Sequence, residues 1–250
     1  MSGGAASRVL SLTAAVLAGA SLAPSAGAQS RFTVAVAGGA ALVPAKWTSS
    51  ASWPAWAETA QLESRQETAS GSVFAGALGF RASRHLGVVL AVSRSTRDAK
   101  AALEATIPNP LFLDRPRAVN HELSGLSYRE LATDLDLEWR TLAGPLELAL
   151  FAGPCLAKVE TDAVQAVQVD EAYPYDEPTF RSADTARVTS DSAFGWNAGG
   201  SAAWLLARHL DLGVEARYSR TSVELKPAEG DAFTLQSGGL QLTARLRLRF

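Results

Sequence analysis

The stretch Leu240-Gln-Leu-Thr-Ala-Arg-Leu-Arg-Leu-Arg-Phe250 alternates apolar and polar residues without an exception. Successive side chains of a β-strand point to opposite faces, so a strand formed here has one wholly apolar face and one wholly polar face. The polar face carries three arginines, which lie across the strand from a row of leucines. The stretch therefore predicts a strand that separates an apolar environment from a polar one.

Seven more segments alternate with period two and are predicted to be strands. In 131–140, for example, Leu135 and Leu137 alternate with Asp134 and Asp136. Helical periodicity is almost absent after residue 28, so the sequence predicts an all-β fold. The predicted strands are 31–43, 72–81, 86–96, 131–140, 146–160, 192–206 and 210–225, followed by one that starts near 233.

The predicted connections between these strands alternate between short and long. The short ones are 82–85, 141–145 and 207–209, the long ones are 44–71, 97–130 and 161–191, and a short one lies at 226–232. Short periplasmic turns at one end and long extracellular loops at the other are the layout of outer-membrane β-barrels. An even number of strands also brings both termini to the periplasmic end.

Residues 1–28 contain the three parts of a secretory signal peptide. These are the basic residue Arg8, an apolar run over 9–22 and the tripeptide Ala26-Gly27-Ala28. We expect cleavage after Ala28, which leaves residues 29–250 as the mature domain. The apolar run of about 14 residues is shorter than the roughly 20 residues of a membrane-spanning helix, which disfavours an anchor.

Charge and cysteine content exclude other classes of protein. The net charge of −2 is too weak for nucleic-acid binding, which needs a concentrated basic surface. Cys155 is the only cysteine, so no internal disulfide can stabilise this exported chain. A closed barrel supplies stability instead, because every strand has two hydrogen-bonded neighbours. Cys155 follows Gly153-Pro154, where we expect a bulge and a small packing residue, not a nucleophile.

Alternation by itself leaves a soluble secreted β-barrel open, because the apolar faces would then turn inward. Three features favour a membrane barrel: the difference in loop length, a last strand that ends at Phe250, and small residues mixed with charges on the polar faces. Gly87, Ala91 and Ser93 are such small residues. A narrow eight-stranded barrel has room inside for side chains only, which suits this mixture.

With this terminal strand and this layout, residues 29–250 resemble the small bacterial outer-membrane β-barrel family, which includes OmpA-type and OmpX/Ail-type domains. The resemblance implies an eight-stranded antiparallel up-and-down transmembrane β-barrel in the bacterial outer membrane. It also implies that Leu246, Leu248 and Phe250 form a C-terminal signal for the barrel-assembly machinery. The match is one of architecture and terminus, and it transfers no functional residue.

The fourth and eighth predicted strands lie opposite each other in an eight-stranded barrel, and their polar faces carry opposite charges. Buried charges are tolerable only when they are paired, so we predict a lumen closed by ion pairs, without a large pore. The alternative is that these residues are solvated at the rims. The predicted lumen residues are Asp134, Asp136, Glu138, Glu147, Asp211, Glu215, Arg81, Arg217, Arg245, Arg247 and Arg249.

Aromatic residues near the predicted strand ends fit the interfacial girdles of membrane barrels. They are Phe32, Phe80, Trp139, Trp204, Tyr218 and Phe250.

The predicted loops carry aromatic residues that would mark a recognition surface if they are exposed. We therefore expect a structural or adhesin-like protein that binds an extracellular ligand through its loops and contacts the outer-membrane bilayer. The candidate recognition residues are Trp47, Trp53, Trp56, Phe112, Tyr173 and Tyr175.

The alternatives are an enzyme that modifies lipid or lipopolysaccharide, a narrow channel, and the soluble secreted barrel. His121 is the only histidine in a predicted long loop, with Ser124 and Ser127 nearby. Proximity in sequence does not supply the hydrogen-bonded pair that nucleophilic catalysis needs, and no G-x-S-x-G motif occurs. No metal-ligand spacing is present either. We expect no enzyme, no cofactor and no metal site.

Overall fold

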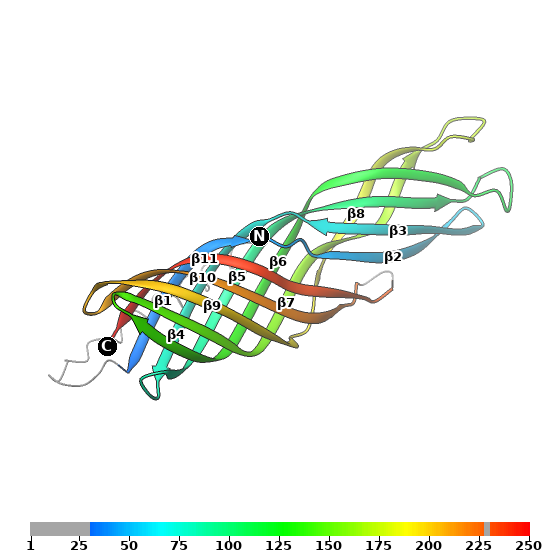
Figure 1. Cartoon of the computed structure of the whole chain (residues 1–250). Helices are drawn as coiled ribbons and strands as arrows, with labels where there is room; N and C mark the ends of the chain where they lie inside the picture. Colours follow the sequence, from blue (N-terminus) through cyan, green and yellow to red (C-terminus); the bar gives the residue numbers. More distant parts are fainter. Residues whose placement is uncertain (1–30, 228–230) are drawn as a thin grey trace, which may run out of the picture.

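The computed structural model describes residues 31–227 and 231–250, so the predicted signal peptide and the tip of the last connection lie outside the described residues. The described residues form eleven strands arranged as one elongated barrel (Figure 1). They contain no helix that is long and apolar enough to cross a membrane. The strands are β1 (Phe32–Ala41), β2 (Lys46–Ala55), β3 (Glu58–Thr68), β4 (Gly71–Arg81), β5 (Leu86–Ile107), β6 (Arg117–Ala143), β7 (Leu146–Asp170), β8 (Thr179–Thr189), β9 (Ala193–Ala207), β10 (Leu210–Leu225) and β11 (Phe233–Arg249).

Eight of these strands close into a ring by antiparallel pairing. The order around the ring is β1, β4, β5, β6, β7, β9, β10 and β11, and β11 pairs back onto β1. They are the eight strands that the alternation predicts, and short turns join β4 to β5, β6 to β7 and β9 to β10. The prediction of an eight-stranded antiparallel up-and-down barrel is confirmed.

The other three strands lengthen this barrel. Along β5, the pairing with β4 ends at Thr96 and the pairing with β3 starts at Ala99. β3 and β4 therefore act as one long strand that is interrupted at 69–70. β8 continues β9 along β7 in the same way, and β2 continues β1. We call the part built from β2, β3, β8, the distal halves of β5, β6 and β7, and the adjoining ends of β10 and β11 the extension.

The extension corrects the prediction of three long loops at 44–71, 97–130 and 161–191. These segments are mostly strand, and β5, β6 and β7 run for 22, 27 and 25 residues. The distal half of β5 shows the reason. The apolar positions point outward as far as Val92 and inward from Ala99, so the apolar face changes side within the strand and no single alternating pattern runs through it.

The half of the barrel next to the short turns, which we call the proximal half, has apolar residues outside and charged residues inside. Leu137 and Leu150 point outward and are 60% and 61% exposed, whereas Asp136 points inward and is 1% exposed. A soluble barrel has the opposite arrangement, so the exposed leucines face lipid. We call this band of outward apolar residues the lipid-facing belt.

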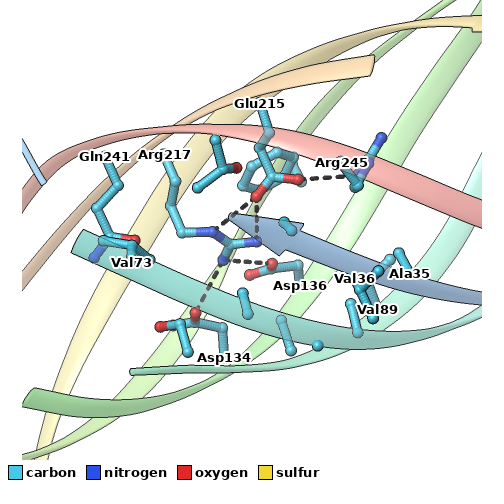
Figure 2. A pocket seen from close by; sticks show the side chains of 18 of the residues that line it. Ala35, Val36, Val73, Val89, Asp134, Asp136, Glu215, Arg217, Gln241 and Arg245 are labelled. Carbon is cyan, nitrogen blue, oxygen red and sulfur yellow. Dashed lines mark hydrogen bonds and ion pairs between the residues drawn. The ribbon is translucent and has the colours of Figure 1, made fainter. Parts of the chain in front are cut away.

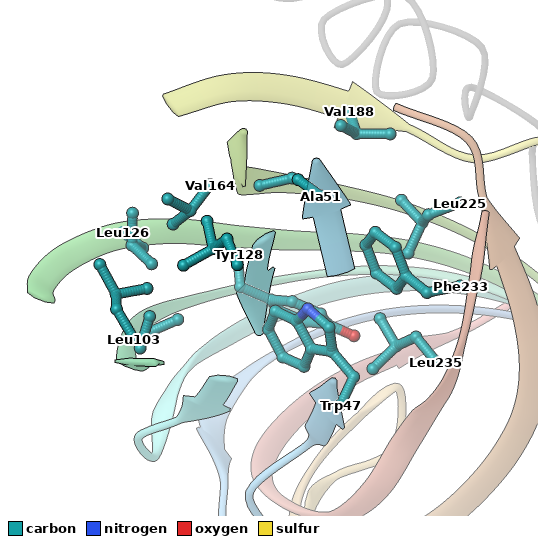
Figure 3. Close-up of a cluster of buried hydrophobic side chains, with 14 of the residues drawn as sticks. Trp47, Ala51, Leu103, Leu126, Tyr128, Val164, Val188, Leu225, Phe233 and Leu235 are labelled. Atoms are coloured by element: carbon teal, nitrogen blue, oxygen red, sulfur yellow. The ribbon is translucent and has the colours of Figure 1, made fainter. Parts of the chain in front are cut away.

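The polarity inverts where the strands leave the belt. On β5 the outward positions become polar at Arg94, and the inward positions are apolar from Ala99 to Ile107. The inward residues of the extension form one apolar core, in which side chains such as Trp47 and Leu235 meet (Figure 3). An apolar core under a polar surface is the arrangement of a domain in water, so the extension projects beyond the membrane.

The extension divides into two arms. β6 pairs with β7 only as far as Tyr128 and Thr161, and beyond that point β6 pairs with β5 while β7 pairs with β8. One arm is the four-stranded sheet β2-β3-β5-β6, and the other is the β7–β8 hairpin. We call their three tips, at residues 56–57, 108–116 and 171–178, the apex (Figure 1).

Candidate functional site

Arg217 on β10 is the centre of a network of ion pairs inside the barrel (Figure 2). Its Nη1 lies 3.1 Å from Asp134 Oδ2 and 2.8 Å from Asp136 Oδ2, both on β6. Its Nη2 lies 3.1 Å from Glu215 Oε1 on the same strand. The guanidinium also stands 4.5 Å from the ring centre of Phe151 on β7. A single arginine thus links three strands across the middle of the lumen.

A second cluster of ion pairs lies nearer the short turns. Arg247 Nε lies 2.9 Å from Asp211 Oδ2, and its Nη2 pairs with Glu147. Arg249 binds the same two acids, at 2.7 Å from Asp211 Oδ2 and 3.1 Å from Glu147 Oε2. These side chains are almost fully buried, so each charge is compensated by a partner and not by water.

The structure places all eleven predicted lumen residues inside the barrel, but their partners differ from the prediction. Among the ion pairs of the described residues, none joins β6 directly to β11. Arg245 pairs with Glu215 at 2.9 Å, and Arg81 lies 4.0 Å from Glu147. The stagger and tilt of barrel strands determine which charged side chains lie at the same height along the barrel axis. Alternation along one strand encodes neither the stagger nor the tilt, so it does not predict the pairs.

Arg140 is a member of the network that the prediction omitted. It lies on the polar face of β6 and pairs with Glu138 on the same strand. With Arg140 included, the network contains as many arginines as carboxylates and is electrically neutral. Its arginines are Arg81, Arg140, Arg217, Arg245, Arg247 and Arg249, and its acids are Asp134, Asp136, Glu138, Glu147, Asp211 and Glu215.

Small side chains form the opposite wall of the lumen. A cavity of about 30 Å³ remains between them and the charged residues, which is space for one or two water molecules. Gly199 on β9 leaves room for the Phe151 ring inside the lumen, because a Cβ at this position would lie 2.5 Å from that ring. The small wall consists of Ala35, Ala37, Ala75, Ala77, Ala91 and Ser93 on β1, β4 and β5.

A polar layer separates the ion-pair network from the apolar core of the extension. Arg97 donates from Nη1 to the Val43 carbonyl at 2.8 Å and from Nη2 to the Gly238 carbonyl at 3.0 Å. Glu130 accepts from the Gly238 amide at 3.3 Å and from the Tyr128 hydroxyl at 2.9 Å. Gly238 has a φ of 106°, which only glycine adopts readily. The two charged side chains thus bind backbone groups where β11 changes direction.

Sequence reasoning missed this layer because Arg97 and Glu130 fall at the two ends of the predicted loop 97–130. Burial, and then the nearby Glu130 carboxylate, raise the pKa of Tyr128 well above its ordinary value, because both disfavour the phenolate. Tyr128 therefore keeps its proton and its hydrogen bond to Glu130 at neutral pH.

Two of the predicted recognition residues are not on loops. Trp47 is 5% exposed and lies inside the extension, with its ring centre 6.0 Å from that of Tyr128, so its prediction as a recognition residue is wrong. Trp53 packs against the same core. The physical reason is that Lys46–Ala55 forms strand β2, and its alternation turns both tryptophans inward.

Three other predicted recognition residues are exposed at the apex, each on a different tip. Trp56, Phe112 and Tyr173 are 66%, 50% and 81% exposed. Tyr175 shares the third tip and is half-buried, and its ring packs edge-on to Tyr173 at 6.2 Å. The fold therefore brings aromatic residues from three distant segments of the chain to one end of the molecule.

Arg117 joins two of the three tips. Its side chain is buried and donates to the Tyr175 carbonyl at 2.7 Å and to the Pro108 carbonyl at 2.6 Å, and it also pairs with Glu171. No sequence motif marks this residue, because two of its partners are backbone carbonyls of other segments. Arg117 therefore fixes the position of the third tip relative to the second.

The remaining tip is joined to the second by one hydrogen bond. The Asp114 amide donates to Glu58 Oε1 at 2.9 Å. Within the second tip, Asn109 Oδ1 accepts from the amides of Leu111 and Phe112, which is a side-chain-capped turn. The three tips thus form one connected surface.

His121 lies at the contact between the two arms. Its ring stacks on that of Phe180 on β8, with ring centres 3.6 Å apart and planes 9° apart. Of the two serines predicted near it, Ser127 donates its amide to Asp162. In residues 31–227 and 231–250, no group of three His, Cys, Asp or Glu residues is placed to hold a metal ion.

Cys155 is buried in the wall of the barrel and packs against Ala132 and Ala157.

The predicted girdle aromatics face outward at the ends of the lipid-facing belt. Tyr218 packs against Trp196 at 5.6 Å, and Phe32 packs against Phe80 at 5.3 Å.

A closed ring of strands with an apolar exterior and a paired, charged interior satisfies every backbone group within lipid. The protein is an integral outer-membrane β-barrel. Its exposed extension and apex lie on the side opposite the short turns, which is the extracellular side in such barrels.

Solved structures with a similar arrangement are outer-membrane barrels. Neisserial surface protein A is 13% identical, with a TM-score of 0.45 over 88% of this chain and 97% of that protein. OprG from Pseudomonas aeruginosa is 10% identical, with a TM-score of 0.49 over 89% and 97%. The protease OmpT from Escherichia coli is 11% identical, with a TM-score of 0.48 over 90% and 100%.

At these identities the likeness is one of general architecture alone. No family model matches the chain, and no curated protein matches its sequence.

Proposed function

We propose that this outer-membrane barrel is a non-catalytic, adhesin-like surface protein that binds an extracellular macromolecule through its apex. The observation that carries the proposal is the buried Arg117, which ties Pro108, Tyr175 and Glu171 together. Loops held in this way lose little conformational entropy on binding. The apex is therefore preorganised as a recognition surface.

The composition of the apex supports recognition of a polypeptide or another large ligand. Exposed Trp, Tyr and Phe supply large contact areas at low entropic cost, and such residues dominate binding energy at protein interfaces. Trp56, Phe112 and Tyr173 are three such residues on three tips. The neighbouring Leu111 and Leu113 are also more than half exposed.

A closed lumen is the second part of the proposal. The neutral ion-pair network and the cavity of only about 30 Å³ support it in the proximal half of the barrel. The apolar core supports it in the extension. In a planar bilayer the purified barrel is expected to show no stable single-channel steps, and steady conductance by the wild-type protein would contradict this part.

The apex is tested by binding of cells that display the protein to immobilised collagen, mucin and heparin. We expect wild-type cells to bind at least one of these surfaces, and the variant Trp56→Ser, Phe112→Ser, Tyr173→Ser to lose that binding. The matched control changes outward residues on the strands of the extension, away from the three tips: Thr48→Ala, Thr106→Ala, Asn120→Ala. Retained binding by the apex variant, or no binding by wild type, would refute apical recognition.

We also propose that the end of β11 is the signal read by the barrel-assembly machinery. The signal would consist of three outward residues that are each about two-fifths exposed: Leu246, Leu248 and Phe250. Their exposure supports contact with the assembly machinery before the barrel enters the membrane. Phe250→Ser is expected to lower the amount of folded barrel in the membrane of expressing cells. Phe74→Ser, which removes another outward phenylalanine, is the control and is expected to lower it less.

A further inference from the structure

The outer boundary of the lipid-facing belt carries a cation on three adjacent strands. Arg94 on β5, Arg129 on β6 and Lys158 on β7 are the first charged residues that face outward beyond the belt. The register places Leu131 directly beside both Arg94 and Lys158, and Arg129 is the next residue on the same face of β6. Residues at such diagonal positions are within reach of one another's long side chains. We call these three cations the β5–β7 basic patch.

The patch has an excess of positive charge. Arg129 lies 3.5 Å from Glu160, and Arg187 lies between Glu160 at 3.3 Å and Asp162 at 3.4 Å, so the excess comes from the other two cations. Arg94 and Lys158 take no part in the ion pairs found among the described residues. Full charges at the edge of an apolar surface are costly to desolvate, so a compensating anion is favoured there.

Apolar and aromatic residues surround the patch on its other sides. Val92, Leu131 and Leu156 lie on the membrane side and are 44%, 48% and 49% exposed. Phe74 pairs with Arg94 from β4, and Phe194 pairs with Leu156 from β9, so each flank has an exposed phenylalanine. The site therefore combines cations above, an apolar floor below and an aromatic ring on each side.

The cations lie on the outer side of the site and the apolar residues lie on its membrane side. An amphiphilic ligand matches this polarity, whereas a wholly water-soluble ligand does not. The cations lie where the headgroups of the outward-facing leaflet begin, and the leucine floor continues into the hydrocarbon layer. A molecule with a phosphate group above acyl chains matches both parts at once. We propose that the β5–β7 basic patch binds the phosphate-bearing headgroup of a lipid in the outward-facing leaflet.

The proposal is tested with full-length protein in phosphatidylcholine vesicles. Electron paramagnetic resonance of spin-labelled lipids measures the relative association of phosphatidic acid and phosphatidylcholine with the barrel. Wild type is expected to prefer phosphatidic acid, and Arg94→Ser, Arg129→Ser, Lys158→Ser is expected to lower that preference by about fivefold or more. Fivefold corresponds to about 1 kcal/mol, the contribution of a single cation near a charged surface, so it is the smallest loss that the proposal allows.

The matched control is Lys46→Ser, Lys100→Ser, Arg220→Ser, which removes the same charge from outward positions elsewhere. It is expected to keep the preference. An equal loss in both triple variants would overturn the proposal, because it would mean that only net charge matters. The absence of any preference in wild type would overturn it as well.

Two further arms distinguish the source of the anion and the effect of misfolding. If inorganic phosphate at about ten times the lipid concentration abolishes the preference, the patch is a free-phosphate site and the lipid proposal fails. Arg94→Lys, Arg129→Lys keeps the charges and is expected to keep the preference. If the serine variant does not fold, as judged by migration of unheated samples, the three single serine variants are compared instead, and unchanged preference in all three contradicts the proposal.

Discussion

Arg217 Nη1 lies 2.8 Å from Asp136 Oδ2 inside the barrel, although 81 residues separate the two in the sequence. Both side chains are buried, and the same guanidinium holds Asp134 and Glu215. Removing one partner from a buried network leaves uncompensated charge, which costs more than the pair contributes when intact. We therefore expect substitution of either partner to destabilise the barrel.

Arg217→Met keeps the length of the side chain and removes its charge, which leaves Asp134 and Asp136 without their ion-pair partner. We expect the free energy of unfolding to fall by about 3–5 kcal/mol. Urea titration in lipid vesicles, followed by tryptophan fluorescence, measures this. Arg220→Met changes an outward arginine three positions further along β10 and is expected to shift the free energy by less than about 0.5 kcal/mol. A similar value for both variants would contradict the network.

Leu150→Arg tests the position of the lipid-facing belt. An arginine on the lipid face near the middle of the membrane is expected to destabilise the barrel by about 2–4 kcal/mol. Ala102→Arg places the same residue on the outward face of the extension, where water solvates it, and is expected to be nearly neutral. The same urea titration measures both. Equal tolerance of the two substitutions would mean that Leu150 does not contact lipid.

Tyr128 gives a pH-dependent prediction. Burial and Glu130 raise its pKa, so it ionises at a higher pH than ordinary tyrosines do. We expect the tyrosinate absorbance of the folded protein to rise equally in wild type and in Tyr128→Phe. After denaturation the variant is expected to show one tyrosine fewer. A smaller rise in the folded variant would show that Tyr128 ionises with the others.

Arg117→Ala tests the rigidity of the apex. The substitution removes the hydrogen bonds to Pro108 and Tyr175 and the ion pair to Glu171, so the third tip is expected to loosen. Limited chymotrypsin digestion of intact cells should then cleave after Tyr175, whose carbonyl Arg117 no longer holds, several times faster. Arg115→Ala removes an exposed arginine of the second tip, two residues before Arg117, and is the control. Unchanged cleavage in Arg117→Ala would rule out its role in fixing the tips.

Gly199→Ala tests the packing of Phe151 across the lumen. The added Cβ would lie 2.4 Å from the Ala216 carbonyl and 2.5 Å from the Phe151 ring, so we expect a loss of about 1–3 kcal/mol in stability. Gly76→Ala is the control, because its Cβ would meet nothing within 4 Å. Thermal unfolding, read as the temperature at which gel migration changes, compares the two. Equal midpoints would show that the lumen has spare room at Gly199.

The sequence was sufficient to predict the ring of the barrel. Alternation such as that of Leu240–Phe250 depends only on the period of two and on the contrast between lipid and lumen, both of which are local properties of a strand. It therefore located all eight ring strands, the inward charges and the outward girdle aromatics. The same rule failed in the extension, because the apolar face of β5 changes from outward to inward between Val92 and Ala99 and interrupts the pattern.

Only the tertiary structure decided which of these residues meet. The pairing of Arg217 with Asp134 and Asp136, rather than of β11 with β6, depends on strand tilt and stagger. The inward turn of Trp47 depends on β2 continuing β1 above the membrane, and the function of Arg117 depends on carbonyl groups of two other segments. Local alternation is encoded residue by residue, whereas the depth of each residue in the barrel is set by hydrogen-bonded register between strands that are far apart in the chain.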